Sequence, residues 1–173
     1  MKLKRAGFTM IEMLVGIALT TAMSGIMLAN FGNYSRQRGQ EAALMRLEQV
    51  FVEAKTNALS GKMDCGASAC GGADGTCNGV NDKFLDGWTV EITGGANGGY
   101  EIYGVCGGTE FMNRTESFPN MTISDTGGGI GHKVIFYPLN GGTSINGNKT
   151  VKVQGSDGVT ISFILTKTGE IIH

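Results

Sequence analysis

The sequence is poor in the residues from which most enzyme and metal sites are built. Its 173 residues include only two histidines, His132 and His173, and no serine or cysteine stands in a recognisable nucleophile motif. The glycine-rich run 127–131 is not followed by the Lys-Ser/Thr pair of a phosphate-binding loop. Four aspartates lack the alternating acidic spacing of a calcium loop: Asp74, Asp82, Asp86 and Asp125. We therefore expect no catalytic residue, no cofactor and no metal, and we expect that the chain is not an enzyme.

Positive charge is also scarce. The chain has 14 lysines and arginines against 15 acidic residues, a net charge of −1. Without residues 1–7, which hold three basic side chains, 11 basic residues remain against 15 acidic ones and the charge becomes −4. A mildly acidic chain argues against a broad nucleic-acid surface. The only hint of a nucleic-acid surface is a set of lysines scattered among the last predicted strands, Lys149, Lys152 and Lys167.

Charged side chains are almost absent from residues 8–31, where Glu12 is the single ionisable group. About 24 residues of helix extend roughly 36 Å, enough to span a bilayer. A carboxylate in hydrocarbon costs on the order of 2.5 to 3.5 kcal/mol, so Glu12 is expected to have a partner that neutralises it. Three basic residues precede the run and the next one is Arg36. This asymmetry predicts a cytoplasmic N-terminus and an outward-facing remainder.

The start of the apolar run carries a specific motif. Gly7-Phe8-Thr9-Met10-Ile11-Glu12, behind a basic leader, resembles the cleavage and methylation signature of type IV prepilins and type II secretion pseudopilins. The resemblance implies that a prepilin peptidase cuts between Gly7 and Phe8, that Phe8 is N-methylated, and that Glu12 meets the N-terminal amine of a neighbouring subunit. An ordinary secretory signal peptide would have a shorter apolar region ending in small residues and no acid near its start.

The helix is expected to continue beyond the membrane. Apolar residues recur at spacings of three and four with charged residues between them: Leu44, Leu47, Phe51, Ala54 and Ala58. Ser60-Gly61 supplies a stop signal. We therefore predict one helix from Phe8 to about Leu59, with residues 8–31 in the membrane or filament core. Residues 32–60 form its amphipathic continuation, whose apolar face packs on the sheet of the head.

Residues 61–173 are predicted to form a β-rich extracytoplasmic head with cysteine- and glycine-rich loops. Strands are expected where apolar and β-branched residues alternate between Gly, Asn and Ser turns, at 88–92, 100–105, 121–123, 133–137, 150–153, 159–165 and 170–172. A helix followed by antiparallel strands is an α+β arrangement. The predicted fold class is thus α+β, a long N-terminal helix packed on an antiparallel β-sheet head.

Three stretches of the head resemble the GspH/FimT family of minor pseudopilins and minor pilins. They are 86–90, 134–141 and 159–172. The cysteine-rich insert and the long glycine loops depart from that family. The resemblance implies a minor subunit rather than an abundant one, and the departures leave the ligand or partner of the head open.

Four cysteines, Cys65, Cys70, Cys77 and Cys106, all follow the apolar run. An even number in an exported head is most simply two disulfides, which contribute about 2 to 4 kcal/mol each. A zinc site would need paired C-x-x-C spacing or nearby histidines, and the sequence has neither. Three pairings are possible. We favour Cys70 with Cys77, closing the glycine loop between them, and Cys65 with Cys106, tying the helix exit to the second hairpin strand.

These features predict a structural minor pilin or pseudopilin subunit of a type IV pilus or type II secretion-like filament. The alternative is a filament-borne binding module that uses its head for DNA uptake or surface adhesion. The expected partners are other pilin or pseudopilin subunits, the prepilin peptidase, the inner-membrane assembly platform and, before assembly, the membrane. We expect a single-pass inner-membrane protein with an extracytoplasmic head that later joins an extracellular or periplasmic filament. The sequence leaves open whether that filament is a pilus, a secretion pseudopilus or a competence fibre.

Overall fold

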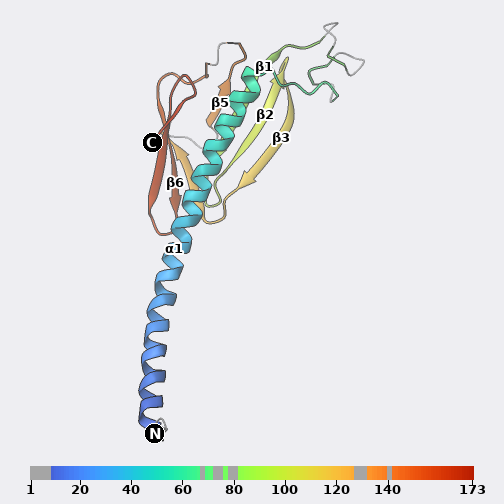
Figure 1. The fold of residues 1–173 in the computed structure, drawn as a ribbon. Coiled ribbons are helices and arrows are strands. Elements are labelled where there is room, and N and C mark those ends of the chain that lie inside the picture. The colour runs from blue at the N-terminus through green and yellow to red at the C-terminus, as the bar shows by residue number, and fades with distance from the viewer. Residues whose placement is uncertain (1–8, 67–68, 72–75, 78–81, 127–131, 140–141) are drawn as a thin grey trace, which may run out of the picture. The chain divides into compact units, whose positions relative to one another are not determined.

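The computed structural model describes residues 9–66, 69–71, 76–77, 82–126, 132–139 and 142–173. In these residues one helix precedes eight strands (Figure 1). The helix is α1 (Met10–Leu59), and the strands are β1 (Leu85–Thr93), β2 (Gly99–Cys106), β3 (Thr109–Ser117), β4 (Met121–Asp125), β5 (His132–Phe136), β6 (Lys149–Gly155), β7 (Thr160–Leu165) and β8 (Ile171–Ile172). The chain divides into two compact units, the first ending at Arg38 and the second comprising Gly39–His173. The α+β class predicted from the sequence is confirmed.

The end of α1 is fixed by its capping residues. Gly61 adopts a left-handed conformation with φ of 64°, which glycine reaches without a side-chain clash. Its N–H donates to the Ala58 carbonyl at 3.2 Å, and the Lys62 N–H donates to the Asn57 carbonyl at 2.9 Å. These two bonds form a Schellman motif. The helix therefore stops at the Ser60-Gly61 pair that the sequence identifies as its stop signal.

The strands form two antiparallel sheets. The first has the order β3-β2-β1-β5 and the second the order β4-β6-β7-β8. β1 and β2 form the predicted hairpin, with Val90 opposite Ile102 and Thr93 opposite Gly99. β5 returns to pair with the other side of β1, where Trp88 lies opposite Phe136. The chain therefore leaves the first sheet after β3, forms one strand of the second, and returns once before completing it.

One face of α1 in the second unit is buried against both sheets. The Phe51 ring meets Phe136 of β5 at 6.3 Å between centroids and Phe163 of β7 at 5.8 Å, both in edge geometry. The helix residues in the common core are spaced by three and four: Ala43, Leu47, Val50, Phe51, Ala54 and Ala58. The predicted apolar stripe therefore packs on the head, as expected, and it joins the two sheets into one core.

β3 was not predicted from the sequence. Only Phe111 of its nine residues is buried, so the strand lacks the alternation by which a strand is recognised. Met112 has a φ of 51°, and the register against β2 shifts between Ile102 and Gly104. β3 is thus a largely polar edge strand with a bulge, held by its pairing with β2 rather than by its own burial.

Candidate functional site

The predicted assembly residue Glu12 lies in the first turn of α1 and is bonded to Thr9. The N–H and the hydroxyl of Thr9 each donate to Glu12 Oε2 at 2.9 Å, and the Glu12 N–H donates to Thr9 Oγ1 at 3.3 Å. This reciprocal pair is a capping box, which satisfies helix N–H groups that lack an intrahelical partner. Sequence reasoning missed Thr9, although the Thr-x-x-Glu spacing is the signal for such a box.

The apolar side chains that follow Glu12 are uncovered within their own unit. Every residue from Met10 to Met27 is exposed, and this 18-residue stretch is long and apolar enough to cross a membrane. A helix of this kind requires lipid or other helices around it. Gly7 and Phe8, the predicted cleavage and methylation positions, lie outside the described residues, so both modifications stay predictions.

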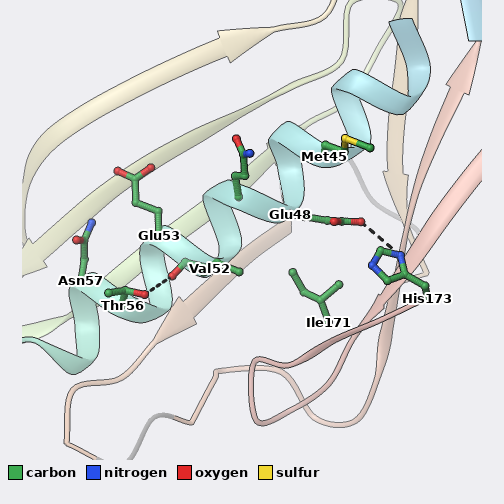
Figure 2. Close-up of a pocket in the computed structure, with 9 residues that line it drawn as sticks. Met45, Glu48, Val52, Glu53, Thr56, Asn57, Ile171 and His173 are labelled. Carbon is green, nitrogen blue, oxygen red and sulfur yellow. Dashed lines mark hydrogen bonds and ion pairs between the residues drawn. The ribbon is translucent and has the colours of Figure 1, made fainter. Parts of the chain in front are cut away.

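A groove of about 620 Å³ lies in the second unit between one side of α1 and the C-terminal strand. Side chains of α1 line one wall, and Ile171 and His173 stand opposite them (Figure 2). The size falls within the range of small-ligand and peptide sites. The lining residues are Met45, Glu48, Gln49, Val52, Glu53, Thr56, Asn57, Ile171 and His173.

The groove combines apolar walls with polar groups at two places. Met45 and Val52 are 60% and 55% exposed and form its apolar surface. Glu48 Oε1 lies 3.6 Å from His173 Nδ1, a charged contact only when the histidine is protonated (Figure 2). The groove can therefore accept a ligand that is partly apolar and carries hydrogen-bonding groups.

Comparison with known proteins adds evidence on the N-terminal segment. Residues 2–28 match the family model of the prokaryotic N-terminal methylation motif, which marks type IV prepilin-like proteins. The chain has a type IV prepilin-like N-terminus. The match includes the predicted positions Phe8 and Glu12 and the whole Met10–Met27 stretch. No curated protein and no solved structure matches the chain significantly.

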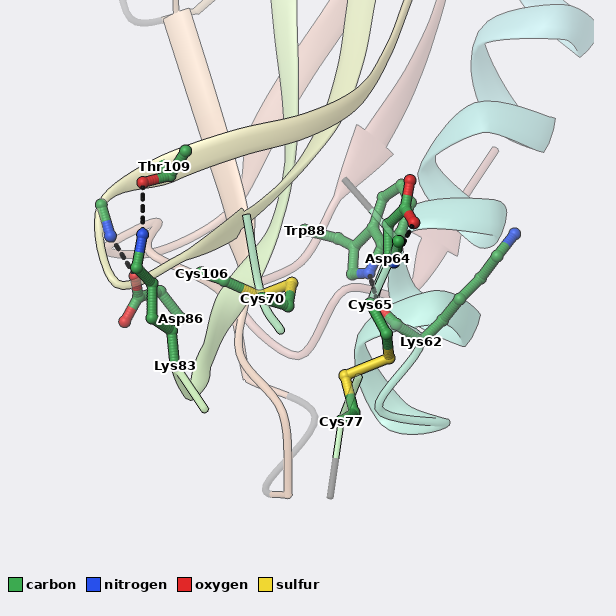
Figure 3. The surroundings of a disulfide bond; sticks show 12 residues. Lys62, Asp64, Cys65, Cys70, Cys77, Lys83, Asp86, Trp88, Cys106 and Thr109 are labelled. Atoms are coloured by element: carbon green, nitrogen blue, oxygen red, sulfur yellow. Dashed lines mark hydrogen bonds between the residues drawn. A yellow bond between two sulfur atoms is a disulfide. The ribbon is translucent and has the colours of Figure 1, made fainter. Parts of the chain in front are cut away.

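The four cysteines form two disulfides, Cys65–Cys77 and Cys70–Cys106 (Figure 3). This differs from the pairing that we favoured, Cys70 with Cys77 and Cys65 with Cys106. Cys70 and Cys106 are both fully buried, and the Lys83 N–H donates to the Cys70 carbonyl at 3.0 Å. That bond holds Cys70 beside the entry to β1, next to the end of β2 where Cys106 lies. Burial of Cys70 in the core therefore decides the pairing, rather than closure of the short loop between Cys70 and Cys77.

A buried polar cluster connects the two sheets. Asp125 of β4, whose side chain is 2% exposed, contacts Lys149 Nζ of β6 at 3.2 Å and His132 Nδ1 of β5 at 3.0 Å. The lysine compensates a carboxylate that would otherwise be buried alone. Asp125 is therefore engaged inside the protein rather than in a calcium site, and Lys149 is engaged rather than presented to a nucleic acid. No group of three or more potential metal ligands occurs among the described residues.

Polar contacts also attach α1 to the first sheet. Arg114 Nη2 of β3 lies 2.7 Å from Glu53 Oε2 of the helix, and this hydrogen bond raises the pKa of the Arg114 guanidinium. The Tyr100 hydroxyl donates to Glu116 Oε2 at 2.6 Å. Burial, with a smaller contribution from that bond, raises the pKa of Tyr100 to about 12. The Arg114–Glu53 pair seats α1 on the first sheet, whereas the Tyr100–Glu116 pair joins β2 to β3 within that sheet.

Proposed function

We propose that this chain is a structural minor pilin or pseudopilin subunit of a type IV pilus or type II secretion-like filament. The observation that carries the proposal is the coincidence, within residues 2–28, of the methylation motif with a helix whose apolar side chains are uncovered in their own unit. Lipid covers these side chains before assembly, and the helices of neighbouring subunits cover them in the filament. The resemblance of the head to GspH/FimT proteins supports a minor role.

The proposed life of the subunit follows from this N-terminus. It inserts once in the inner membrane with its N-terminus in the cytoplasm and its head outside. The prepilin peptidase removes residues 1–7 and methylates Phe8, and the assembly platform then transfers the subunit into the filament.

Glu12 is the proposed contact between subunits. The backbone N–H and the hydroxyl of Thr9 both donate to Oε2, so Oε1 can accept from the cationic amine on Phe8 of a neighbouring chain. That contact would neutralise a carboxylate whose presence in an apolar medium is otherwise unfavourable. It forms only between assembled chains, so it sets their register without stabilising the isolated subunit.

Three variants separate the charge of Glu12 from its role in the capping box. Glu12→Gln keeps a residue that can complete the box and removes the charge. Thr9→Ala removes the box and keeps the charge, and Glu12→Ala removes both. The measurement is the amount of subunit in sheared filaments relative to the membrane fraction at equal expression. Intact mass should show in each case the loss of residues 1–7 and one added methyl group.

We expect Glu12→Gln and Glu12→Ala to lower incorporation into filaments sharply and to similar extents. Thr9→Ala should lower it much less. If Glu12→Gln assembles like the wild type while Thr9→Ala fails, Glu12 acts through the capping box and the intersubunit contact is wrong.

A role for the head as a filament-borne binding module is the second candidate. The groove beside α1 is the observation that favours it. Nucleic acid is not the ligand that this surface suggests, because Glu48 and Glu53 place carboxylates along it. Binding by the head is compatible with a structural role for the helix, since the two use separate residues.

A further inference from the structure

The turn that follows β5 holds a leucine where glycine or asparagine is usual. Leu139 has a φ of 72° and comes directly after Pro138. A left-handed residue after proline is typical of the third position of a type II turn, which glycine or asparagine commonly occupies. A leucine reaches this conformation only with crowding between its Cβ and the following carbonyl oxygen. Leucine at this position is therefore unfavourable for the turn itself.

The Leu139 side chain is not covered by its own head. It is 99% exposed, the highest value among the large apolar residues that the structure describes. The base of the turn is closed by the backbone, because the Tyr137 N–H donates to the Gly142 carbonyl at 3.0 Å. A side chain that is apolar, exposed and held in an unfavourable conformation points to contact with a partner outside the chain.

A second exposed apolar side chain lies at the same end of the first sheet. Trp88 of β1 is opposite Phe136 of β5 in an antiparallel pair, so the chain enters β1 at the end where it leaves β5. Phe84 immediately precedes β1 and is 88% exposed. We call Phe84 and Leu139 the apolar tip. Two such side chains make this end of the head an apolar projection.

The head also carries a surface that can receive these side chains. Met45 and Val52 are seven positions apart, about two turns of α1, so they lie on the same side of the helix. Ile171 stands opposite them across the groove (Figure 2). We call these three residues the apolar strip. Because Leu139 is almost fully exposed, it does not occupy the strip of its own chain.

We propose that the apolar tip of one copy docks on the apolar strip of a second copy of this chain. The two surfaces differ, so the contact is heterologous: a pair of copies keeps one unused tip and one unused strip, to which further copies can add. The proposal goes beyond the proposed function, which needs only the N-terminal helix. It requires that at least two copies of the subunit be neighbours in the filament.

Charged side chains beside the two surfaces have opposite signs. Lys83 adjoins the apolar tip and is exposed, and its Nζ contacts the neutral Thr109 hydroxyl at 3.1 Å. Glu48 lies beside the apolar strip, where its neighbour His173 is charged only when protonated. Opposite charges favour the docking of tip on strip. Docking of tip on tip would instead bring two Lys83 side chains together.

The test is photo-crosslinking between mature full chains held one per lipid nanodisc. One copy carries a photoreactive benzophenone amino acid in place of Gln49, an exposed residue that lines the groove. The second copy is labelled with heavy nitrogen, so cross-links between copies are distinguished from those within one. Separate discs keep the membrane helices apart and leave only the heads able to meet. We expect cross-links from the probe to Phe84, Leu139 or their sequence neighbours in the labelled copy.

Matched variants of the labelled copy assign the contact to Leu139. Leu139→Asn keeps a residue that adopts the left-handed conformation readily and removes the apolar side chain, whereas Leu139→Met keeps an apolar side chain. Val159→Asn is the control at another apolar residue, 43% exposed, in the turn between β6 and β7. We expect the cross-link yield to fall at least tenfold for Leu139→Asn and to change less than twofold for the two controls.

The unfolding temperature separates docking from a role of Leu139 in its own turn. It is measured for the mature full chain in detergent micelles by the fluorescence of the single tryptophan, Trp88. Leu139→Asn should unfold at the wild-type temperature or above it, because asparagine relieves the crowding in the turn. A lower temperature would show that Leu139 stabilises its own head and would overturn its assignment to docking.

The distribution of cross-links decides the identity of the partner. Cross-links to lipid or to the disc scaffold alone, cross-links to other parts of the second copy, or no cross-links would each overturn the docking of tip on strip. Glu12→Gln should leave the yield unchanged, because the two chains sit in separate discs. The head contact and the contact proposed for Glu12 can therefore fail independently.

Discussion

The disulfide between Cys70 and Cys106 should stabilise the head more than the one between Cys65 and Cys77. The former closes a loop that spans 36 positions and the latter a loop that spans 12. The loop-entropy relation gives about 4 kcal/mol for the long loop and about 3 kcal/mol for the short one. The perturbation that tests this is replacement of each pair in turn, Cys70→Ala with Cys106→Ala and Cys65→Ala with Cys77→Ala.

Burial widens the difference between the two pairs. Cys70 and Cys106 are 0% exposed, whereas Cys65 is half-buried and Cys77 is exposed. Removal of two buried sulfur atoms resembles the loss of two core methyl groups, which adds roughly 1 to 3 kcal/mol. The core pair should therefore cost about 2 to 4 kcal/mol more than the surface pair.

The assay is urea unfolding of residues 36–173, produced in an oxidising compartment and followed by the fluorescence of Trp88. Paired replacement avoids leaving one free thiol that could form a new disulfide. Equal losses from both pairs, or a larger loss from Cys65 and Cys77, would refute the reasoning. Peptide mapping under non-reducing conditions provides an independent check, and a Cys70–Cys77 linkage would contradict the fold of this segment.

Two further predictions concern the packing of α1 on the sheets and the Tyr100 hydroxyl within the first sheet. Phe51→Ala should lower the free energy of unfolding by about 3 to 5 kcal/mol, because the ring is 1% exposed and joins both sheets; exposed Val52→Ala is the control and should change it by about 0.5 kcal/mol or less. The raised pKa of Tyr100, about 12 against 10.0, means that the folded state holds this proton more tightly. The stability that depends on this proton is therefore present in full below pH 10 and is lost as the pH rises through 12. Tyr100→Phe should remove this part of the alkaline loss of stability, and an unchanged pH profile would contradict it.

Local rules account for the elements that the sequence predicts well. The helix end needs only Gly61 in a left-handed conformation, and the stripe that contains Leu47 and Phe51 repeats with the helical period. The β1–β2 hairpin joins neighbours in sequence. In each case the residues that determine the structure lie within a few positions of it, so a sequence pattern is sufficient.

Pairing between distant segments is where the sequence stops being sufficient. The division into two sheets depends on the pairing of β5 with β1. The sequence of neither strand indicates that the other is its partner. β3 has one buried side chain and is held by its partner. The disulfide pairing depends on which cysteine the core encloses, so it follows from the tertiary fold and could not be read from loop lengths.

The candidate sites divide in the same way. Glu12 stands out because a charged residue is unfavourable within an apolar membrane-spanning run, and this can be recognised from the sequence alone. Asn57 becomes unusual only in the folded structure, where its buried Nδ2 lacks a hydrogen-bond partner. In the sequence it is an ordinary polar residue near a helix end. In the isolated chain, Glu12 lacks a group that neutralises its charge and Asn57 Nδ2 lacks a hydrogen-bond acceptor. The contact proposed for Glu12 involves no residue of the head, so Asn57→Ala should leave assembly through Glu12 intact.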